Sequence, residues 1–164
     1  MIIKNAELKY LDKIIEISKN SGGFMAQNNR MIYYLCCTVF SKYSFIAIKK
    51  DNNEENVVGF IFVVRDSYSR YLWIHQLAVM PDEKEKLAAG SLIHKLLHII
   101  DEEKLINGLR FAIRTDNKLS YSIAMNFNNK SFAKKGYSCK SLGISEELSQ
   151  NFNMEVFEVS SEYN

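Results

Sequence analysis

The sequence of 164 residues suits one domain, and its 47% hydrophobic and 24% charged residues exclude the composition of a disordered chain. A formal net charge of +2, from 21 Lys and Arg against 19 Asp and Glu, excludes the large basic excess that a nucleic-acid backbone attracts. No apolar run approaches the roughly 18 residues of a membrane span, so we expect neither a nucleic acid nor a membrane as a partner.

The N-terminal segment predicts one strand and one helix. The opening residues MIIKNAELKYLDK carry charges where a signal peptide needs an uninterrupted apolar stretch, which favours the cytoplasm. The short apolar start at 1–3 predicts a strand. Up to the stop signal Ser21-Gly22-Gly23, apolar residues then recur at helical spacing, at Leu8, Leu11, Ile14 and Ile15.

A second helix is predicted to end near Ser41. Its apolar residues repeat as adjacent pairs four apart, the stripe of a helix that lies on a core, and they are Met31, Ile32, Leu35, Cys36, Val39 and Phe40. Because Cys36 and Cys37 are neighbours and Cys139 is isolated, their spacing fits neither a CxxC redox pair nor a metal-binding knuckle. We therefore expect buried free thiols.

The pattern then changes to β-branched and aromatic runs at 45–48, 57–64 and 71–79, which predict a three-stranded antiparallel meander. A third helix is expected to end at a glycine cap near Asn107-Gly108. Its apolar stripe is Leu92, Ile93, Leu96, Leu97, Ile99 and Ile100. On its outer face His94 and His98 lie four residues apart, where a solvated surface is the more ordinary role than a metal site without a third ligand.

The last third of the chain adds a strand at 110–115, a polar helical region to about Lys135, and closing strands at 137–143 and 154–160. The order of elements is therefore strand, two helices, three strands, helix, strand, helix, two strands. This order predicts one α/β (α+β) domain over residues 1–164, in which about four helices flank a mixed, mostly antiparallel sheet of about seven strands.

The connection from the strand at 71–79 to the third helix carries a chemical signal. It leads through MPDEKEK into the small residues Ala88, Ala89, Gly90 and Ser91, which place little bulk around the unpaired N–H groups of a helix that we expect to start near Ala89. Lys84 and Lys86 add positive charge just before these amides. The pattern fits a pyrophosphate, and it also fits an ordinary connection with solvated lysines.

This segment resembles the signature of the GNAT superfamily of N-acetyltransferases, L-x-V-x-P, then Arg or Gln, two residues, Gly, one residue, and Gly or Ala. The corresponding residues are Leu77, Val79, Pro81, Lys84, Leu87 and Ala89. Further similarities lie at Val58-Gly59-Phe60, Asp116-Asn117 and Lys134-Lys135-Gly136-Tyr137. The resemblance extends from Ile2 to Val159, and it implies a GNAT-like fold that transfers an acetyl group from acetyl-CoA to the primary amine of a small molecule or amino acid, without a metal.

Some positions depart from the family pattern. Leu87 stands where the family has a glycine, and Lys84 where it has Arg or Gln. Phe132 takes the position of a tyrosine that protonates the departing CoA thiolate. The segment after Asn117 is longer than usual, so either the last helix is extended or Asn126 takes the role of Asn117. Leu87 and Phe132 motivate one alternative, a catalytically degenerate GNAT-like domain that acts as an acyl-CoA sensor or interaction module. A second alternative is a fold that binds another acyl-CoA, because no residue pattern in the sequence identifies the acyl pocket.

The resemblance also implies where the cofactor binds. The pyrophosphate of acetyl-CoA would lie on the amides from Glu85 to Gly90, and the pantetheine arm would pair with the backbone of Leu77 and Val79 like an added strand. The expected cofactor-binding residues are Leu77, Ala78, Val79, Lys84, Glu85, Lys86, Leu87, Ala88, Ala89, Gly90, Ser91, Asn117 and Phe132.

Transfer to an amine requires a base, because a protonated ammonium has no lone pair for attack on a thioester. His75 is the candidate, since imidazole titrates near neutral pH and its position resembles that of a histidine in the serotonin N-acetyltransferase branch. A half-buried core histidine with a satisfied hydrogen bond is the other interpretation. Tyr121 could protonate the thiolate in place of Phe132, or it could be a structural tyrosine.

Substrate contacts are expected from Arg30, Tyr33 and Tyr34, because the second helix borders the acceptor pocket in the family. A finer similarity, to the diaminobutyrate acetyltransferases, rests on the run WIHQLAV and on Asn28, Leu35, Cys37, Phe40, Ser44 and Ala47. Dimers are common in the family, so a homodimer is one assembly to expect.

Overall fold

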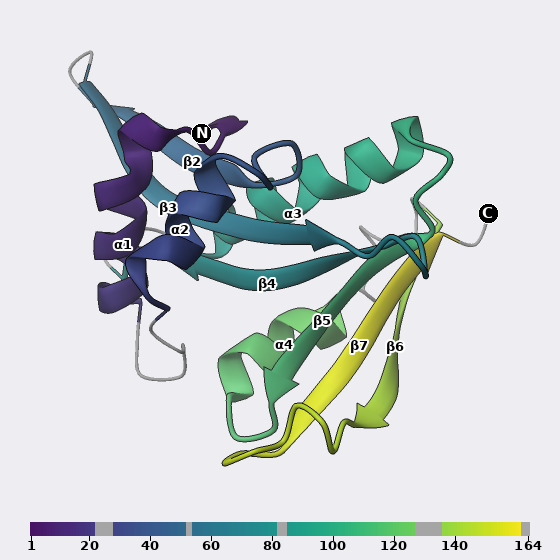
Figure 1. Ribbon diagram of the computed structural model, residues 1–164. Coiled ribbons are helices and arrows are strands. Elements are labelled where there is room, and N and C mark those ends of the chain that lie inside the picture. Colours follow the sequence, from purple (N-terminus) through teal and green to yellow (C-terminus); the bar gives the residue numbers. More distant parts are fainter. Residues whose placement is uncertain (22–27, 52–53, 82–84, 127–135, 162–164) are drawn as a thin grey trace. The chain divides into compact units, whose positions relative to one another are not determined.

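The computed structural model describes residues 1–21, 28–51, 54–81, 85–126 and 136–161 (Figure 1). In chain order its elements are β1 (Ile2–Asn5), the 3₁₀ helix η1 (Leu8–Tyr10), α1 (Leu11–Asn20), α2 (Arg30–Cys37), β2 (Phe45–Asp51), β3 (Glu54–Arg65), β4 (Tyr71–Val79), α3 (Glu85–Glu102), β5 (Gly108–Arg114), α4 (Lys118–Asn126), β6 (Tyr137–Ile144) and β7 (Met154–Ser161). The strands form a seven-stranded sheet in the order β1-β2-β3-β4-β5-β7-β6. The predicted order of strands and helices is confirmed.

The chain forms two compact units, which are described separately. The first comprises Met1–Val64 with Ile74–Glu102, and the second comprises Arg65–Trp73 with Glu103–Asn164. Within the described residues, no helix combines the length and the apolar character needed to cross a membrane.

In the first unit β1, β2 and β3 pair antiparallel. Ala47 lies opposite Gly59, whereas Ile48 lies opposite Val57, so the register shifts by one residue at this point. Strict alternation would send Val57 and Phe60 to opposite faces of the sheet. The shift brings both side chains into one buried cluster, which is the effect of a β-bulge.

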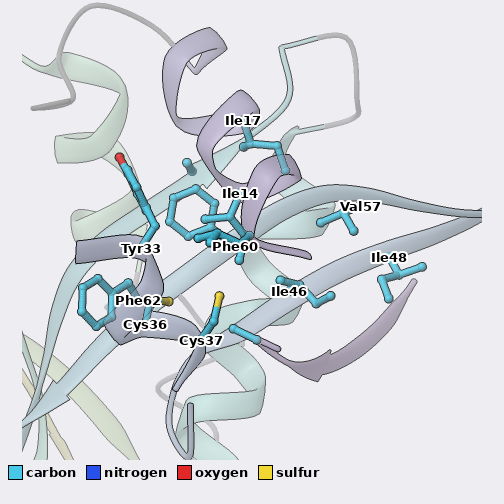
Figure 2. Close-up of a cluster of buried hydrophobic side chains, with 13 residues drawn as sticks. Ile14, Ile17, Tyr33, Cys36, Cys37, Ile46, Ile48, Val57, Phe60 and Phe62 are labelled. Carbon is cyan, nitrogen blue, oxygen red and sulfur yellow. The ribbon is translucent and has the colours of Figure 1, made fainter. Parts of the chain in front are cut away.

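Helices α1 and α2 cover this face of the sheet, and Figure 2 shows their side chains meeting those of β2 and β3. Leu11, Ile14 and Ile17 form the buried stripe of α1, at the spacing of an amphipathic helix. The ring of Tyr33 on α2 meets that of Phe60 edge-on, with centroids 6.2 Å apart. The buried members of the cluster are Ala6, Leu11, Ile14, Ile17, Tyr33, Cys36, Cys37, Ile46, Ile48, Val57, Phe60, Phe62 and Ala78.

Helix α3 lies against β1 and β2. Phe45 and Ala47 are buried and alternate with Ile46 and Ile48, so they point to the other face of the sheet, which α3 covers. The buried residues of α3 follow its predicted apolar stripe and include both alanines near its start: Ala88, Ala89, Leu92, Ile93, Leu96, Leu97, Ile99 and Ile100.

Two predicted helix ends are wrong. Helix α2 ends at Cys37 and not near Ser41, and Val39 is 67% exposed although it continues the sequence stripe. The Thr38 hydroxyl donates a hydrogen bond to the Tyr34 carbonyl oxygen, 2.8 Å away, at the point where the helix stops. Such side-chain bonds compete with the helical ladder, which gives a physical reason for the early stop.

Helix α3 ends at Glu102, so Gly108 is not its cap. Gly108 instead begins β5, with φ of 159°. A Cβ atom at this position would lie 2.1 Å from the carbonyl oxygen of Val159 on β7. Glycine is therefore required by the close approach of two strands and not by a helix terminus.

In the second unit β7 pairs antiparallel with β5 on one side and with β6 on the other. Phe111 lies directly opposite Phe157, and their rings stack with centroids 5.6 Å apart. The ring of Tyr121 on α4 meets Phe157 edge-on at 5.4 Å. These aromatic contacts attach α4 to the sheet of this unit.

The three cysteines are buried free thiols, as predicted. Burial raises the pKa of Cys139 to about 11. That thiol therefore stays protonated at neutral pH and behaves as a small apolar side chain.

Candidate functional site

A chain of polar side chains runs through the helix-covered face of the first unit. Nδ2 of Asn28 lies 3.2 Å from Nε2 of His75 and 3.3 Å from Oε1 of Gln76. Nε2 of Gln76 lies 3.3 Å from Oγ of Ser18, which is in turn hydrogen-bonded to the hydroxyl of Tyr33. The chain of hydrogen bonds thus joins β4 to α1, to α2 and to the residue that precedes the cap of α2.

The inner members of this chain are buried, with exposed fractions of 3% for Ser18, 2% for Tyr33 and 5% for Gln76. A buried hydroxyl or amide without a partner would cost about 1–3 kcal/mol. Among the described residues, no buried side-chain nitrogen or oxygen lacks a partner. The packing of α1 and α2 on the sheet therefore depends on these groups meeting one another, and the network fixes their relative orientation.

His75 lies at the outer end of this chain. Its ring meets Phe62 edge-on with centroids 5.0 Å apart, while part of the side chain stays exposed. Burial by the surrounding protein atoms lowers the pKa of His75. The imidazole is therefore neutral at neutral pH, which is the form that can accept a proton.

Consecutive residues of a strand normally point to opposite faces. His75 contacts Phe62 of the helix-covered face, and Gln76 bonds to Ser18 of α1 on that same face. Asn28 contacts both of them. Both side chains therefore reach Asn28, although His75 is exposed and Gln76 is buried on this strand.

The start of α3 differs from the prediction. The helix is already formed at Glu85, the first described residue after the gap at 82–84, and so does not start near Ala89. The free N–H groups of a helix belong to its first turn. Because the helix is formed from Glu85 onward, the amides of Ala88, Ala89 and Gly90 lie inside the helical ladder, and an anion at this helix would meet amides that precede them.

Residues 87–91 of α3 divide into buried residues that pack in the core and residues on the solvent side of the helix. Ala88 and Ala89 are buried in the core, so packing accounts for their size. Leu87 is 59% exposed, and a Cβ atom added to Gly90 would meet no atom within 4 Å. Ser91 Oγ donates to the Leu87 carbonyl oxygen at 2.8 Å, so this hydroxyl is engaged within the helix.

Leu87 and Gly90 open onto a shallow depression of about 460 Å³ along α3. Its lining residues are Ile3, Leu87, Gly90, Ser91, His94, Lys95 and His98. His98 is 3.5 Å from Glu102, and the described part of the chain holds no cluster of three His, Cys, Asp or Glu residues that could bind a metal ion.

On β4, Ala78 is buried, whereas Leu77 and Val79 are half-buried. Gly59 on β3 packs against this end of the strand, where an added Cβ atom would lie 2.9 Å from Val79 Cγ1 and 3.0 Å from the Ala78 carbonyl oxygen. The glycine of the Val58-Gly59-Phe60 element is thus explained by the close approach of β3 and β4.

In the second unit Tyr121 donates a hydrogen bond to Glu155, with 2.8 Å between the two oxygens. This bond, together with burial and the charge of Glu155, raises the pKa of Tyr121. The tyrosine is therefore protonated at neutral pH, with its proton held by a carboxylate.

Asn117 caps α4, because its Oδ1 accepts a hydrogen bond from the backbone N–H of Ser120 at 3.1 Å. Asn126 lies within that helix, at the last residue described before the gap at 127–135. Of the two sequence alternatives, Asn117 is therefore the helix start. Lys84 and Phe132 lie outside the described residues, so their cofactor-binding roles stay predictions.

The three predicted substrate-binding residues have different environments. Arg30 forms an exposed ion pair with Asp12 at 2.7 Å, and Tyr34 is 44% exposed. Tyr33 is buried and uses its hydroxyl in the polar chain, so it would act on a substrate only through Ser18 and Gln76. The sequence pattern did not identify Ser18 and Gln76 as members of this site. The signal that could have identified them is a polar residue at a helix or strand position where the periodicity calls for a buried apolar side chain.

No protein-family model matches the sequence, and no curated protein matches it. Solved structures match almost the entire chain. A diaminobutyrate acetyltransferase from Paenibacillus lautus, in complex with L-2,4-diaminobutyric acid and coenzyme A, has a TM-score of 0.78 at 16% identity and covers 99% of this chain and 96% of its own.

Two further structures show the same architecture. A ribosomal-protein-alanine N-acetyltransferase from Brucella melitensis has a TM-score of 0.68 at 12% identity and covers 98% of this chain and 99% of its own. The GNAT-like decarboxylase GphF, in complex with isobutyryl-CoA, has a TM-score of 0.72 at 13% identity and covers 99% of this chain and 100% of its own. At these identities the matches establish a shared fold.

Proposed function

From the GNAT fold that this chain adopts, we propose that it is an N-acetyltransferase that moves an acetyl group from acetyl-CoA to the primary amine of a small molecule or amino acid. Among the matched structures are complexes with CoA or with an acyl-CoA, which supports an acyl-CoA as co-substrate. The observation that carries the proposal is His75, a neutral imidazole on β4 at the outer end of a buried polar chain.

His75 supplies the base that amine transfer requires. Its Nε2 can take a proton from the acceptor ammonium, which leaves a lone pair on the amine nitrogen. The polar chain behind His75 limits the movement of the strand that carries it. Bound acetyl-CoA would supply the thioester carbonyl that the amine attacks and the thiolate that departs.

The residues at the start of α3 fit the diphosphate of such a cofactor. The first-turn amides of α3 form a partial positive pole. The open space beside Gly90 allows a ligand to approach the helix without a Cβ atom in its way. We assign these amides and Gly90 to the cofactor, with Leu77 and Val79 of β4 as the backbone partners of its pantetheine arm.

Calorimetric titration with acetyl-CoA tests this assignment. We expect a dissociation constant below about 1 mM, the upper range of ordinary enzyme–substrate affinities. Gly90→Glu should lower the affinity at least tenfold, because it adds bulk and negative charge beside the diphosphate, while the fold tolerates it. Leu105→Glu adds the same charge at a 62% exposed residue outside the helix and serves as the matched control.

Release of CoA thiol in the presence of a panel of primary amines tests the chemistry. Binding of acetyl-CoA without thiol release from any amine would favour the sensor or interaction module, to which the exposed Leu87 at the first turn of α3 also points. Absence of both binding and release would contradict the proposed function.

A further inference from the structure

The carboxamide of Asn28 makes an unusual pair of contacts. One nitrogen, Nδ2, lies 3.2 Å from the imidazole Nε2 of His75 and 3.3 Å from Oε1 of Gln76. An amide NH₂ group carries two hydrogens and no accepting lone pair. It can therefore donate one hydrogen to each neighbour, and both neighbours must then be acceptors.

The orientation of the Gln76 carboxamide follows from its other hydrogen bond, to Ser18. Its Nε2 faces Ser18 Oγ at 3.3 Å, so Oε1 is the atom turned toward Asn28. With Nε2 of His75 also accepting from Asn28, the neutral imidazole carries its hydrogen on Nδ1. The lone pair on Nε2 thus points to the place where the Asn28 nitrogen now lies.

The donor Asn28 and its two acceptors differ in how firmly they are held. Gln76 is 5% exposed and bonded to α1 through Ser18, and His75 packs against Phe62. Asn28 is only half-buried and lies next to the start of α2. Its amide can return to water at little cost, whereas Gln76 is held by burial and by Ser18, and His75, although exposed, is held by its ring contact with Phe62.

We propose that Nε2 of His75 and Oε1 of Gln76 form the binding pair for the primary amine of the acceptor, and that the carboxamide of Asn28 occupies this pair until the amine displaces it. The inference rests on the proposed function and adds to it the subsite for the amine. The ligand class is a primary ammonium, which can donate to both acceptors and retains a third N–H.

In this arrangement one N–H bond of the bound ammonium breaks, and its proton moves to Nε2 of His75. The electron pair of that bond stays on the amine nitrogen for attack. Gln76 accepts a second N–H and orients the nitrogen. A protonated tertiary amine offers a single N–H, so it cannot donate to both His75 and Gln76. The two acceptors therefore favour primary over tertiary amines.

Nuclear magnetic resonance of protein labelled with ¹⁵N at histidine tests the proposal without any cofactor turnover. Two-bond proton–nitrogen correlations identify which ring nitrogen carries the hydrogen. The chain has three histidines, so His94 and His98 on α3 are internal references, and His75→Gln assigns the third signal. We expect the Nδ1–H form for His75 at neutral pH, and its Nε2 signal should shift on titration with n-butylamine but not with N,N-dimethylbutylamine, with or without CoA.

Two variants of Asn28 extend the test. Asn28→Ala removes the competing donor, so His75 should lose its bias to the Nδ1–H form, and n-butylamine should bind about fivefold more tightly, the value of one hydrogen bond. Asn28→Asp keeps the size but places a carboxylate against two acceptors, so His75 should carry a hydrogen on Nε2. Asn107→Ala removes an amide that donates to the Ser69 carbonyl oxygen in the second unit and should leave His75 unchanged.

The outcomes separate this proposal from the proposed function. An Nε2–H form of His75 in the wild type, or an Nε2 signal that ignores n-butylamine, overturns the proposal even if the protein acetylates amines. If the expected shifts are seen but no amine releases CoA thiol, the proposed amine subsite is supported and the proposed acetyltransferase activity is contradicted.

Discussion

Glu158 lies at the centre of a charged cluster in the second unit, and its removal should destabilise the protein. The residue is buried, with an exposed fraction of 5%. Nε and Nη2 of Arg110 reach Oε2 at 3.0 and 2.8 Å, and Lys140 Nζ reaches Oε1 at 2.9 Å. The guanidinium of Arg110 also lies 4.0 Å from the centroid of the Tyr71 ring.

The size of the effect follows from the exposure of each partner. Removing one member of a buried ion pair costs about 3–5 kcal/mol, because the other charge stays desolvated. The side chain of Arg110 is 25% exposed, but that of Lys140 is 64% exposed and returns to water almost freely. We therefore expect Glu158→Ala to lower the free energy of unfolding by about 2–3 kcal/mol, and Glu158→Gln by about 1–2 kcal/mol, since the amide still accepts hydrogen bonds.

The pH dependence gives a second readout. Burial by itself raises the pKa of Glu158, but the hydrogen bonds and charges of Lys140 and Arg110 outweigh it, so the net shift is downward. A lowered pKa in the folded state means that the stabilisation is complete above the unfolded value of about 4.3 and is lost as the pH falls through the folded value. The difference between wild type and Glu158→Gln should therefore shrink in acid.

Urea unfolding followed by circular dichroism, with linear extrapolation, measures these free energies. Glu146→Ala removes an exposed carboxylate from the same unit and should change stability by less than about 0.5 kcal/mol. A double-mutant cycle with Arg110→Met isolates the pair. A loss below about 0.5 kcal/mol for Glu158→Ala, or no coupling to Arg110, would refute the reasoning.

Three other substitutions test separate parts of the structure. Gly108→Ala should cost more than about 3 kcal/mol in thermal unfolding, because its Cβ would lie 2.1 Å from the Val159 carbonyl oxygen, and a melting temperature like that of the wild type would contradict this packing. Asn117→Ala should cost about 1 kcal/mol in urea unfolding through loss of the α4 cap, whereas an unchanged midpoint would remove Asn117 from the cap. His75→Ala should lower kcat about 10²–10⁴-fold with little change in acetyl-CoA affinity. In the wild type, the midpoint of the acid limb in the pH profile of kcat/KM should lie below about pH 6.5, because burial lowers the pKa of His75. A midpoint well above that pH would exclude His75 as the base.

Periodicity was sufficient to predict the elements, because helices and strands bury side chains at short, regular spacings. The stripe of α1 and the apolar runs of β2, β3 and β4 all appear in the structure where they were expected. Helix ends were harder to predict, since they depend on competing local bonds. The Thr38 hydrogen bond accompanies the early end of α2. Gly108 is required by its close approach to Val159, 51 residues away on β7, and not by a helix terminus.

In the candidate site, too, one part could be predicted from the sequence and another part could not. A histidine on the strand at 71–79 could be identified from the sequence as a base, and its pKa is lowered by burial as a base at neutral pH requires. Strict alternation, however, would send His75 and Gln76 to opposite faces of β4, and yet the side chains of both contact Asn28. The partners of both residues could therefore not be predicted from the strand pattern.

The sequence by itself determined the order of helices and strands and the buried faces, because each depends on residues a few positions apart. Only the tertiary structure decided that Asn28 meets His75 across 47 positions and that Gln76 meets Ser18 across 58. Contacts at such separations leave no local period in a sequence. They form because buried polar groups must find partners when the helices pack on the sheet.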